Sequence, residues 1–124
     1  MNLMEQAQAK VDSTDLSSAV RLMEEARVLR PSDEVVLFRL ASLHYDLKHY
    51  DKARNYAQEA INLAPTQWLY HYLLGRIEGS AGRWREARTS LEAAIKMNPS
   101  AVEAHNALAE ITLREKQSTK SGFP

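Results

Sequence analysis

Histidine is the residue type in this chain best suited to bind a metal ion. Two of the four histidines, His71 and His105, occupy equivalent positions in successive repeats of the sequence. If they lie on neighbouring helices, their backbones are roughly 10 Å apart, which is too far for one ion with ligand bonds near 2 Å unless the side chains converge. The chain has no cysteine, so no thiolate can bind a metal. We predict no metal site.

Motifs that bind phosphate groups or carry out catalysis are absent from the sequence. It has no phosphate-binding loop, no glycine-rich dinucleotide fingerprint, no nucleophile elbow and no His-Glu-x-x-His motif. We therefore predict no catalytic residue and no cofactor, and we interpret the chain as a protein that is not an enzyme.

The most basic stretch contains Arg83, Arg85 and Arg88, with Arg76 nearby. Nucleic-acid binding would need a basic surface with aromatic platforms, but glutamates alternate with these arginines. Over the whole chain, 16 Lys and Arg residues are balanced by 16 Asp and Glu residues, so no overall field attracts nucleic acid or an anionic membrane. We predict a solvated helix face with local ion pairs, and no binding to nucleic acid or membranes.

Three prolines at a constant interval show which elements position these side chains. Pro31, Pro65 and Pro99 are equally spaced, and they end the similar phrases ARVLRP, AINLAP and AIKMNP. Proline lacks an amide proton and clashes with the preceding turn, so each phrase is typical of the end of a helix. A period of about 34 residues indicates a repeated pair of helices.

The hydrophobic residues recur at helical spacing and predict seven helices in antiparallel pairs, with no strand. We expect turns near residues 13–15, 48–49 and 81–83, with Gly82 in the left-handed conformation. Helix caps are expected within the stretches Asp12-Ser13-Thr14-Asp15 and Ser32-Asp33, at Thr66 and at Ser100. The predicted repeats cover about residues 1–33, 34–67 and 68–101, and a capping helix at 101–117 and a disordered tail at 118–124 follow them.

The repeat resembles the tetratricopeptide repeat family. The residues that carry the resemblance in the third copy are Leu74-Gly75, Ala87, Leu91, Ala94 and Pro99, and in the second copy Leu40-Ala41, Ala53, Ala57, Ala60 and Pro65. His44 and Glu78 stand where the family pattern has tyrosine. The resemblance covers about residues 2–117 and implies an all-α, right-handed α-solenoid of three helix pairs plus a C-terminal solvating helix. It also implies binding to other proteins.

In this family the first helix of each pair lines a concave groove. Aromatic and arginine side chains are favoured at binding hot spots, and such residues lie on that side of the predicted first helices. Trp68 is expected at the rim and more accessible than Trp84. The predicted peptide-binding groove consists of Val35, Phe38, Arg39, Ser42, Tyr45, Leu69, Tyr72, Leu73 and Arg76.

The best-known binding mode of the family is a clamp of Lys, Asn and Arg residues that holds the acidic C-terminal tails of heat-shock chaperones. The corresponding positions here hold Met4, Gln8, Arg39, Leu69 and Leu73, of which one is basic. We therefore predict a tetratricopeptide protein without the chaperone clamp.

The leading hypothesis for function is a non-catalytic scaffold or adaptor that binds an extended or helical segment of another protein. The segment is expected to be apolar with acidic residues. Residues 1–6 do not read as a signal peptide, so we predict a cytoplasmic location. One alternative is a structural array that associates weakly with itself through Leu3, Met4 and Val11. Another is an accessory domain of a larger multidomain protein.

Overall fold

The computed structural model describes residues 15–121, with side chains as far as residue 118. Within that range the chain forms six α-helices and no strand, so the predicted all-α fold is confirmed. The predicted first helix lies outside the described residues, as do Leu3, Met4 and Val11. The helices are α2 (Leu16–Leu29), α3 (Glu34–Asp46), α4 (Tyr50–Leu63), α5 (Trp68–Ser80), α6 (Trp84–Met97) and α7 (Val102–Ser121).

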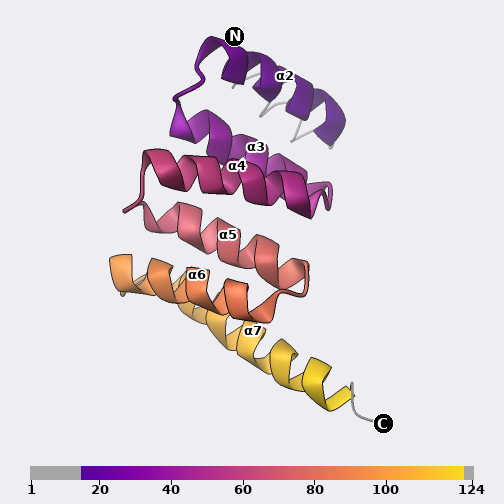
Figure 1. Ribbon diagram of the computed structural model, residues 1–124, viewed down its shortest axis with the longest axis vertical. Helices are drawn as coiled ribbons and strands as arrows, with labels where there is room; N and C mark the ends of the chain where they lie inside the picture. Colours follow the sequence, from indigo (N-terminus) through magenta and orange to yellow (C-terminus); the bar gives the residue numbers. More distant parts are fainter. Residues whose placement is uncertain (1–14, 122–124) are drawn as a thin grey trace. The chain divides into compact units, whose positions relative to one another are not determined.

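The chain forms two compact units, divided at the Pro65–Thr66 bond. The first unit contains α2, α3 and α4, and the second contains α5, α6 and α7 (Figure 1). In the first unit α3 packs against both α2 and α4, and in the second α6 packs against both α5 and α7. Helices α3 and α5 begin at the first residues of the second and third predicted repeats.

Aspartate side chains cap the beginning of two helices, as predicted. Asp15 Oδ1 accepts a hydrogen bond from the Ser18 backbone N–H at 3.1 Å before α2. Asp33 Oδ1 accepts one from the Val35 N–H at 2.9 Å before α3. These bonds satisfy amide groups that have no partner in the first turn of a helix, which fixes where each helix begins.

The two predicted hydroxyl caps are wrong. Helix α5 begins after Gln67 and has no side-chain cap, so Thr66 lies one residue too early. The Ser100 hydroxyl donates to Asn98 Oδ1 at 3.0 Å, and α7 begins only at Val102. A helix that starts one residue later than expected moves its free amides beyond the reach of a short hydroxyl side chain.

The end of α7 also differs from the prediction. The sequence predicts a disordered tail from residue 118, but the helix continues to Ser121. No glycine or proline interrupts the chain between Pro99 and Gly122, so nothing in this stretch forces the helix to end at residue 117. The last residues, 122–124, lie outside the described range.

The turns inside the two helix pairs have the same backbone shape but different residues. Gly82, between α5 and α6, has φ 80°, as the sequence predicts. Lys48, at the same repeat position between α3 and α4, has φ 65°. A side chain is strained in this left-handed region, whereas glycine tolerates it. The first unit therefore carries a strained lysine where the second unit has an unstrained glycine.

We expect Lys48→Gly to raise the free energy of unfolding by about 1 kcal/mol, because it relieves the strain at positive φ. Gly82→Ala should lower it by a similar amount, although a β-carbon at residue 82 would meet no atom within 4 Å. Urea unfolding followed by circular dichroism measures both changes. A Lys48→Gly variant less stable than the wild type would contradict this assignment of strain.

The core of each unit is built on alanines that recur with the repeat. Their small side chains allow the helices to approach closely, and each is at most 5% exposed. In the first unit, large side chains such as Met23 and Leu40 fill the space around them. These recurring alanines are Ala19, Ala26, Ala53, Ala60, Ala87 and Ala94.

The close contact within each helix pair is filled differently in the two units. In the second unit, a β-carbon added to Gly75 would lie 2.6 Å from Leu91 Cγ and 3.3 Å from the Ala87 carbonyl oxygen. In the first unit the equivalent residues are Ala41 and Ala57, which are 0% and 1% exposed. One pair therefore combines glycine with leucine, and the other combines two alanines.

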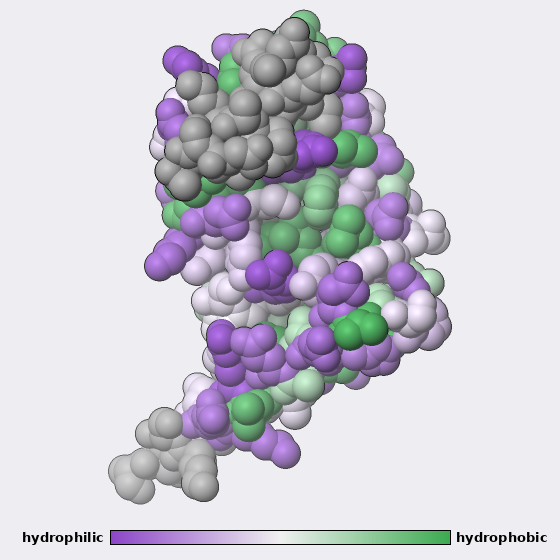
Figure 2. Space-filling model, turned by 180° about the vertical axis from the view of Figure 1, so that it is seen from behind, coloured by the Kyte–Doolittle hydropathy of each residue, from purple (hydrophilic) through white to green (hydrophobic). Residues whose placement is uncertain are grey.

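Among the residues whose side chains are described, seven large hydrophobic side chains remain exposed. Val28 and Leu29 at the end of α2 are 77% and 73% exposed, and Leu113 on α7 is 57% exposed. The face shown in Figure 2 has small hydrophobic areas separated by hydrophilic ones. No helix among residues 15–121 combines the length and the apolar character needed to cross a membrane.

Candidate functional site

Part of the predicted groove lies on α3, in the first unit. Val35 is 40% exposed and Arg39 is also exposed, while the rings of Phe38 and Tyr45 are partly buried. The Tyr45 ring lies beside Tyr50 at the start of α4, with centroids 6.1 Å apart. Residues three and four positions apart share one side of a helix, so α3 presents apolar, aromatic and guanidinium groups together. The α3 residues of the predicted groove are Val35, Phe38, Arg39, Ser42 and Tyr45.

The other accessible groove residues lie on α5, in the second unit, and they form a connected row. The Trp68 and Tyr72 rings are tilted against each other with centroids 5.9 Å apart. Arg76 is exposed, and its guanidinium carbon lies 5.7 Å from the centre of the Tyr72 ring. These residues are four positions apart, so the row runs along one side of the helix. Leu69 is partly buried beside it in the sequence.

Leu73 does not belong to an accessible surface, and the prediction that it lines the groove is wrong. It is 5% exposed, as is Tyr70, and Ile77 is fully buried. Spacings of three and four residues place these side chains in one buried stripe of α5. At the equivalent position of α3 the chain has Arg39, which is exposed. The same helix position is therefore core in one unit and surface in the other.

Trp68 is a candidate site residue that the predicted groove did not include. Both indole rings are partly buried, so the prediction that Trp68 is more accessible than Trp84 stays a prediction. Trp68 packs against a cluster of buried alanines that includes Ala94 and Ala104. Its spacing of four residues from Tyr72 is the signal in the sequence that relates it to the groove residues.

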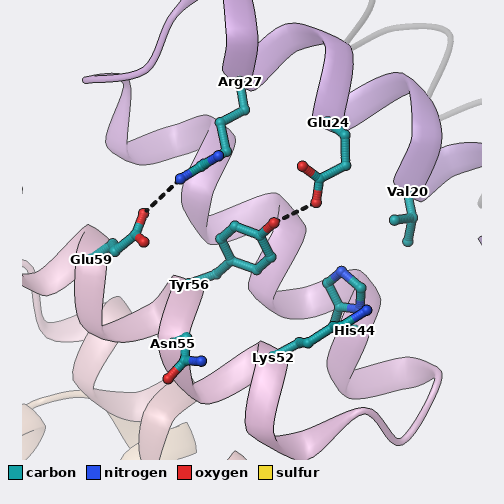
Figure 3. Close-up of a pocket in the computed structure, with 8 residues that line it drawn as sticks. All are labelled: Val20, Glu24, Arg27, His44, Lys52, Asn55, Tyr56 and Glu59. Carbon is teal, nitrogen blue, oxygen red and sulfur yellow. Dashed lines mark hydrogen bonds and ion pairs between the residues drawn. The ribbon is translucent and has the colours of Figure 1, made fainter.

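A pocket of about 420 Å³ lies in the first unit, mainly on α2 and α4, which carry no residue of the predicted groove (Figure 3). The Tyr56 hydroxyl donates a hydrogen bond to Glu24 Oε1, which links α4 to α2. Arg27 lies over the Tyr56 ring at 5.5 Å and pairs with Glu59 at 3.6 Å. The pocket is lined by Val20, Glu24 and Arg27 from α2, His44 from α3, and Lys52, Asn55, Tyr56 and Glu59 from α4.

The electrostatics of this pocket are balanced. Two glutamates face one arginine and one lysine, and the Arg27 Nε is buried with no hydrogen-bond partner. Burial and the bond to Glu24 raise the pKa of Tyr56 to about 12, so its hydroxyl stays a donor at neutral pH. Small-molecule pockets of this size are usually lined mainly by apolar groups. This one is mainly polar, and two contacts link α2 to α4 in it: the Tyr56–Glu24 hydrogen bond and the Arg27–Glu59 ion pair.

The histidines considered for metal binding have other surroundings. His105 is exposed, and its Nε2 lies 2.8 Å from the Pro99 carbonyl oxygen. His71 is partly buried on α5. Among residues 15–121, no group of three or more His, Cys, Asp or Glu side chains is arranged to hold a metal ion.

Sequence profiles identify the family of this chain. One profile described as tetratricopeptide repeat matches residues 35–67, and a second with the same description matches residues 72–121. Together they cover more than half of the chain, and they include α3, α4 and most of the second unit. The chain belongs to the tetratricopeptide repeat family. The family's small-residue positions are the buried alanines and Gly75 described above.

Solved structures of tetratricopeptide repeat domains have the same fold. The first such domain of Spaghetti (RPAP3), bound to the HSP90 peptide SRMEEVD, has a TM-score of 0.86 at 19% identity, covering 92% of this chain and 90% of that one. The Sgt2 domain from Aspergillus fumigatus has a TM-score of 0.89 at 17% identity, covering 98% and 82%. The chain therefore has the all-α tetratricopeptide solenoid fold that the sequence predicts.

One similar structure belongs to a much longer protein. A mutant O-GlcNAc transferase from Thermobaculum terrenum is 27% identical with a TM-score of 0.81, and the match covers 88% of this chain. The chain spans 21% of the length of that transferase. Comparison with curated protein sequences found no match.

Proposed function

We propose that this chain is a non-catalytic module that binds an extended or helical segment of a partner protein through the accessible sides of α3 and α5. The observation that carries this proposal is the row of Trp68, Tyr72 and Arg76. Trp, Tyr and Arg are the residue types most enriched at binding hot spots. A peptide bound to a similar domain of Spaghetti also favours this function. A role as a scaffold and a cytoplasmic location stay predictions.

The proposed partner segment is apolar and carries one or two carboxylates. Arg39 and Arg76 are both exposed on the proposed surfaces. An arginine fork can hold a carboxylate by two parallel hydrogen bonds, and the neighbouring rings provide apolar contact area. The residues proposed to bind the partner are Val35, Phe38, Arg39, Ser42 and Tyr45 on α3, and Leu69, Tyr72 and Arg76 with the added Trp68 on α5.

The chaperone peptide of the similar domain is not the proposed ligand. Of the predicted clamp positions, Arg39 is basic, whereas Leu69 is partly buried and Leu73 is buried. A clamp needs several donors for two carboxylates, and two leucines provide none. We expect SRMEEVD to bind at least tenfold more weakly than the acidic, apolar peptides described next.

The experiment is a selection from a display library of 12-residue peptides, followed by calorimetry with the enriched peptides. We expect enriched peptides to combine apolar and acidic residues. Phe38→Ala should weaken their binding about thirtyfold, because losing a contact ring typically costs about 2 kcal/mol. Arg76→Ala should weaken it about tenfold at low salt and less at high salt.

Arg85→Ala is the matched control, because Arg85 is an exposed arginine on α6, a helix that carries none of the proposed residues. It should bind the selected peptides as tightly as the wild type. Thermal melts establish that each variant is folded before its binding is compared. Equal enrichment on the wild type and on a Phe38→Ala/Arg76→Ala double variant would contradict the proposed surface.

A further inference from the structure

The last turn of the first helix in each pair carries a buried polar side chain at the same repeat position. His44 occupies that position in the first unit and Glu78 in the second, and each is 4% exposed. In both turns the backbone N–H five residues later donates to the carbonyl of this residue, at 2.8 Å for His49 and 2.9 Å for Arg83. The two turns therefore share their backbone bonds and differ in the side chains that they bring together.

The side-chain pairs have different chemistry. In the second unit Arg83 Nε lies 3.7 Å from Glu78 Oε2, which is a contact between opposite charges. In the first unit His44 Nδ1 and His49 Nδ1 are 3.2 Å apart. Two imidazole nitrogens at this distance share one hydrogen, so one ring donates it and the other accepts with its lone pair.

The first and the second proton added to the histidine pair affect its hydrogen bond differently. A first proton can add to the Nε2 of the donor ring, and the bond between the two Nδ1 atoms is kept. A second proton has to add to the accepting Nδ1, because its lone pair, which accepts the hydrogen bond, is the last one without a proton. This removes the hydrogen bond and places two positive rings against each other. Burial disfavours a charge on His44, and the pKa of its ring is lowered.

Groups from every packed element face His44. Tyr56 stacks on its ring with centroids 5.5 Å apart and an angle of 15° between the planes. Lys52 from α4 and Glu24 from α2 line the same pocket, and so do Arg27 and Glu59 (Figure 3). Burial lowers the pKa of His44, the positive charges of His49 and Lys52 lower it further, and Glu24 opposes them.

We propose that the His44–His49 pair is an acid-sensitive contact, and that its second protonation loosens the packing of α2 against α3 and α4. A charged His44 needs water, and water reaches this ring only when the side chains around the pocket move apart. Tyr56 lies on His44 and also holds α2 through Glu24, so movement of this ring disturbs the connection between α2 and α4. The second unit has a contact between opposite charges, Arg83 with Glu78, where the first unit has two imidazoles.

The direction of the pH effect follows from the lowered pKa. A histidine in the unfolded chain binds its proton near pH 6.5, whereas folded His44 binds it only at lower pH. The contribution of this contact to stability is thus fully present above pH 6.5, and it is lost as the pH falls below that value.

The experiment is hydrogen exchange of the whole chain at pH 7.5 and pH 5, read as protection factors so that the intrinsic pH dependence of exchange cancels. We expect protection of α2 to fall by about threefold or more relative to α5 and α6, which serve as an internal reference. His44→Tyr places the family's residue at this position and should remove that difference. Exchange that falls equally in both units would overturn the proposal.

Two further variants distinguish the pair from a general effect of charge. His49→Ala leaves the buried ring in place but removes the second positive ring. The loss of α2 protection between pH 7.5 and pH 5 should therefore become smaller. His105→Ala removes an exposed histidine of the second unit and should leave the loss unchanged. An acid-dependent loss that persists in full in both His44→Tyr and His49→Ala would also overturn the proposal.

Discussion

Leu91→Ala is expected to lower the free energy of unfolding by about 3 kcal/mol. Leu91 is fully buried in a cluster with Ala87 and Ile111, and the rings of Tyr72 and Trp84 pack against this cluster. Truncating the side chain removes buried methyl groups and leaves a cavity, because the surrounding helices relax only in part. Urea unfolding monitored by circular dichroism measures the loss.

A second substitution, Gly75→Ala, should lower or raise the free energy of unfolding depending on which residue is at position 91. In the wild type a new β-carbon would lie 2.6 Å from Leu91 Cγ, so overpacking should cost about 1–2 kcal/mol. The Leu91→Ala variant lacks the Leu91 Cγ contact and keeps only the tight one to the Ala87 carbonyl oxygen at 3.3 Å. Alanine is also favoured over glycine within a helix by about 1 kcal/mol. There the same change should therefore stabilise the protein. The double variant has the two alanines that the first unit carries as Ala41 and Ala57.

A double-mutant cycle over these two positions gives the interaction directly. We expect a coupling free energy of about 2 kcal/mol, well above the few tenths found for independent sites. Ala41 and Ala57 supply the comparison, since each is already buried with a partner of matching size. Additive effects of Gly75→Ala and Leu91→Ala would mean that the two residues do not share this contact.

The ends of several helices could be predicted well because they are set by residues close to them in the sequence. Proline ends a helix through its own ring and its missing N–H. Pro31 and Pro65 have this effect whatever packs around them. Asp33 caps α3 through a bond to a residue two positions away. Gly82 takes the left-handed conformation that its missing side chain permits. None of these assignments needs knowledge of a distant residue.

The groove residues were harder to assign because exposure depends on what packs against a helix. Arg39 and Leu73 occupy one repeat position, yet the first is exposed and the second is buried. Spacing alone gives both the same direction on their helices. The chemistry of the side chain, a guanidinium or an aliphatic group, was the better guide to burial at this position.

The pocket in the first unit was not predicted for a similar reason. Glu24 and Tyr56 are 32 residues apart in the sequence, and their hydrogen bond exists only because α2 and α4 approach each other. Charged residues on a helix are usually exposed to solvent, so nothing in the sequence indicated that Glu24 on α2 forms such a contact. Contacts of this kind become visible only once the packing of the helices is known.

Tyr72→Ala is expected to lower the free energy of unfolding by about 2–3 kcal/mol. The Tyr72 ring packs against the cluster of Ala87, Leu91 and Ile111, and it also packs against the cluster of Ala94, Ala101 and Ala104. It therefore fills space between two parts of the core of the second unit, although it is only partly buried. Removing it should cost less than removing a fully buried ring and more than an ordinary surface change.

Tyr72→Phe separates the ring from its hydroxyl and should stay within about 0.5 kcal/mol of the wild type. Tyr45→Ala is a second control, because its ring contacts Tyr50 and lies outside both clusters, so it should cost about 1 kcal/mol. Because Tyr72 supports the fold and also carries the Arg76 contact, its role in binding has to be measured where the alanine variant is still fully folded. A loss below about 0.5 kcal/mol for Tyr72→Ala would show that the ring is a surface group, and any loss of peptide binding would then be due to the contact itself.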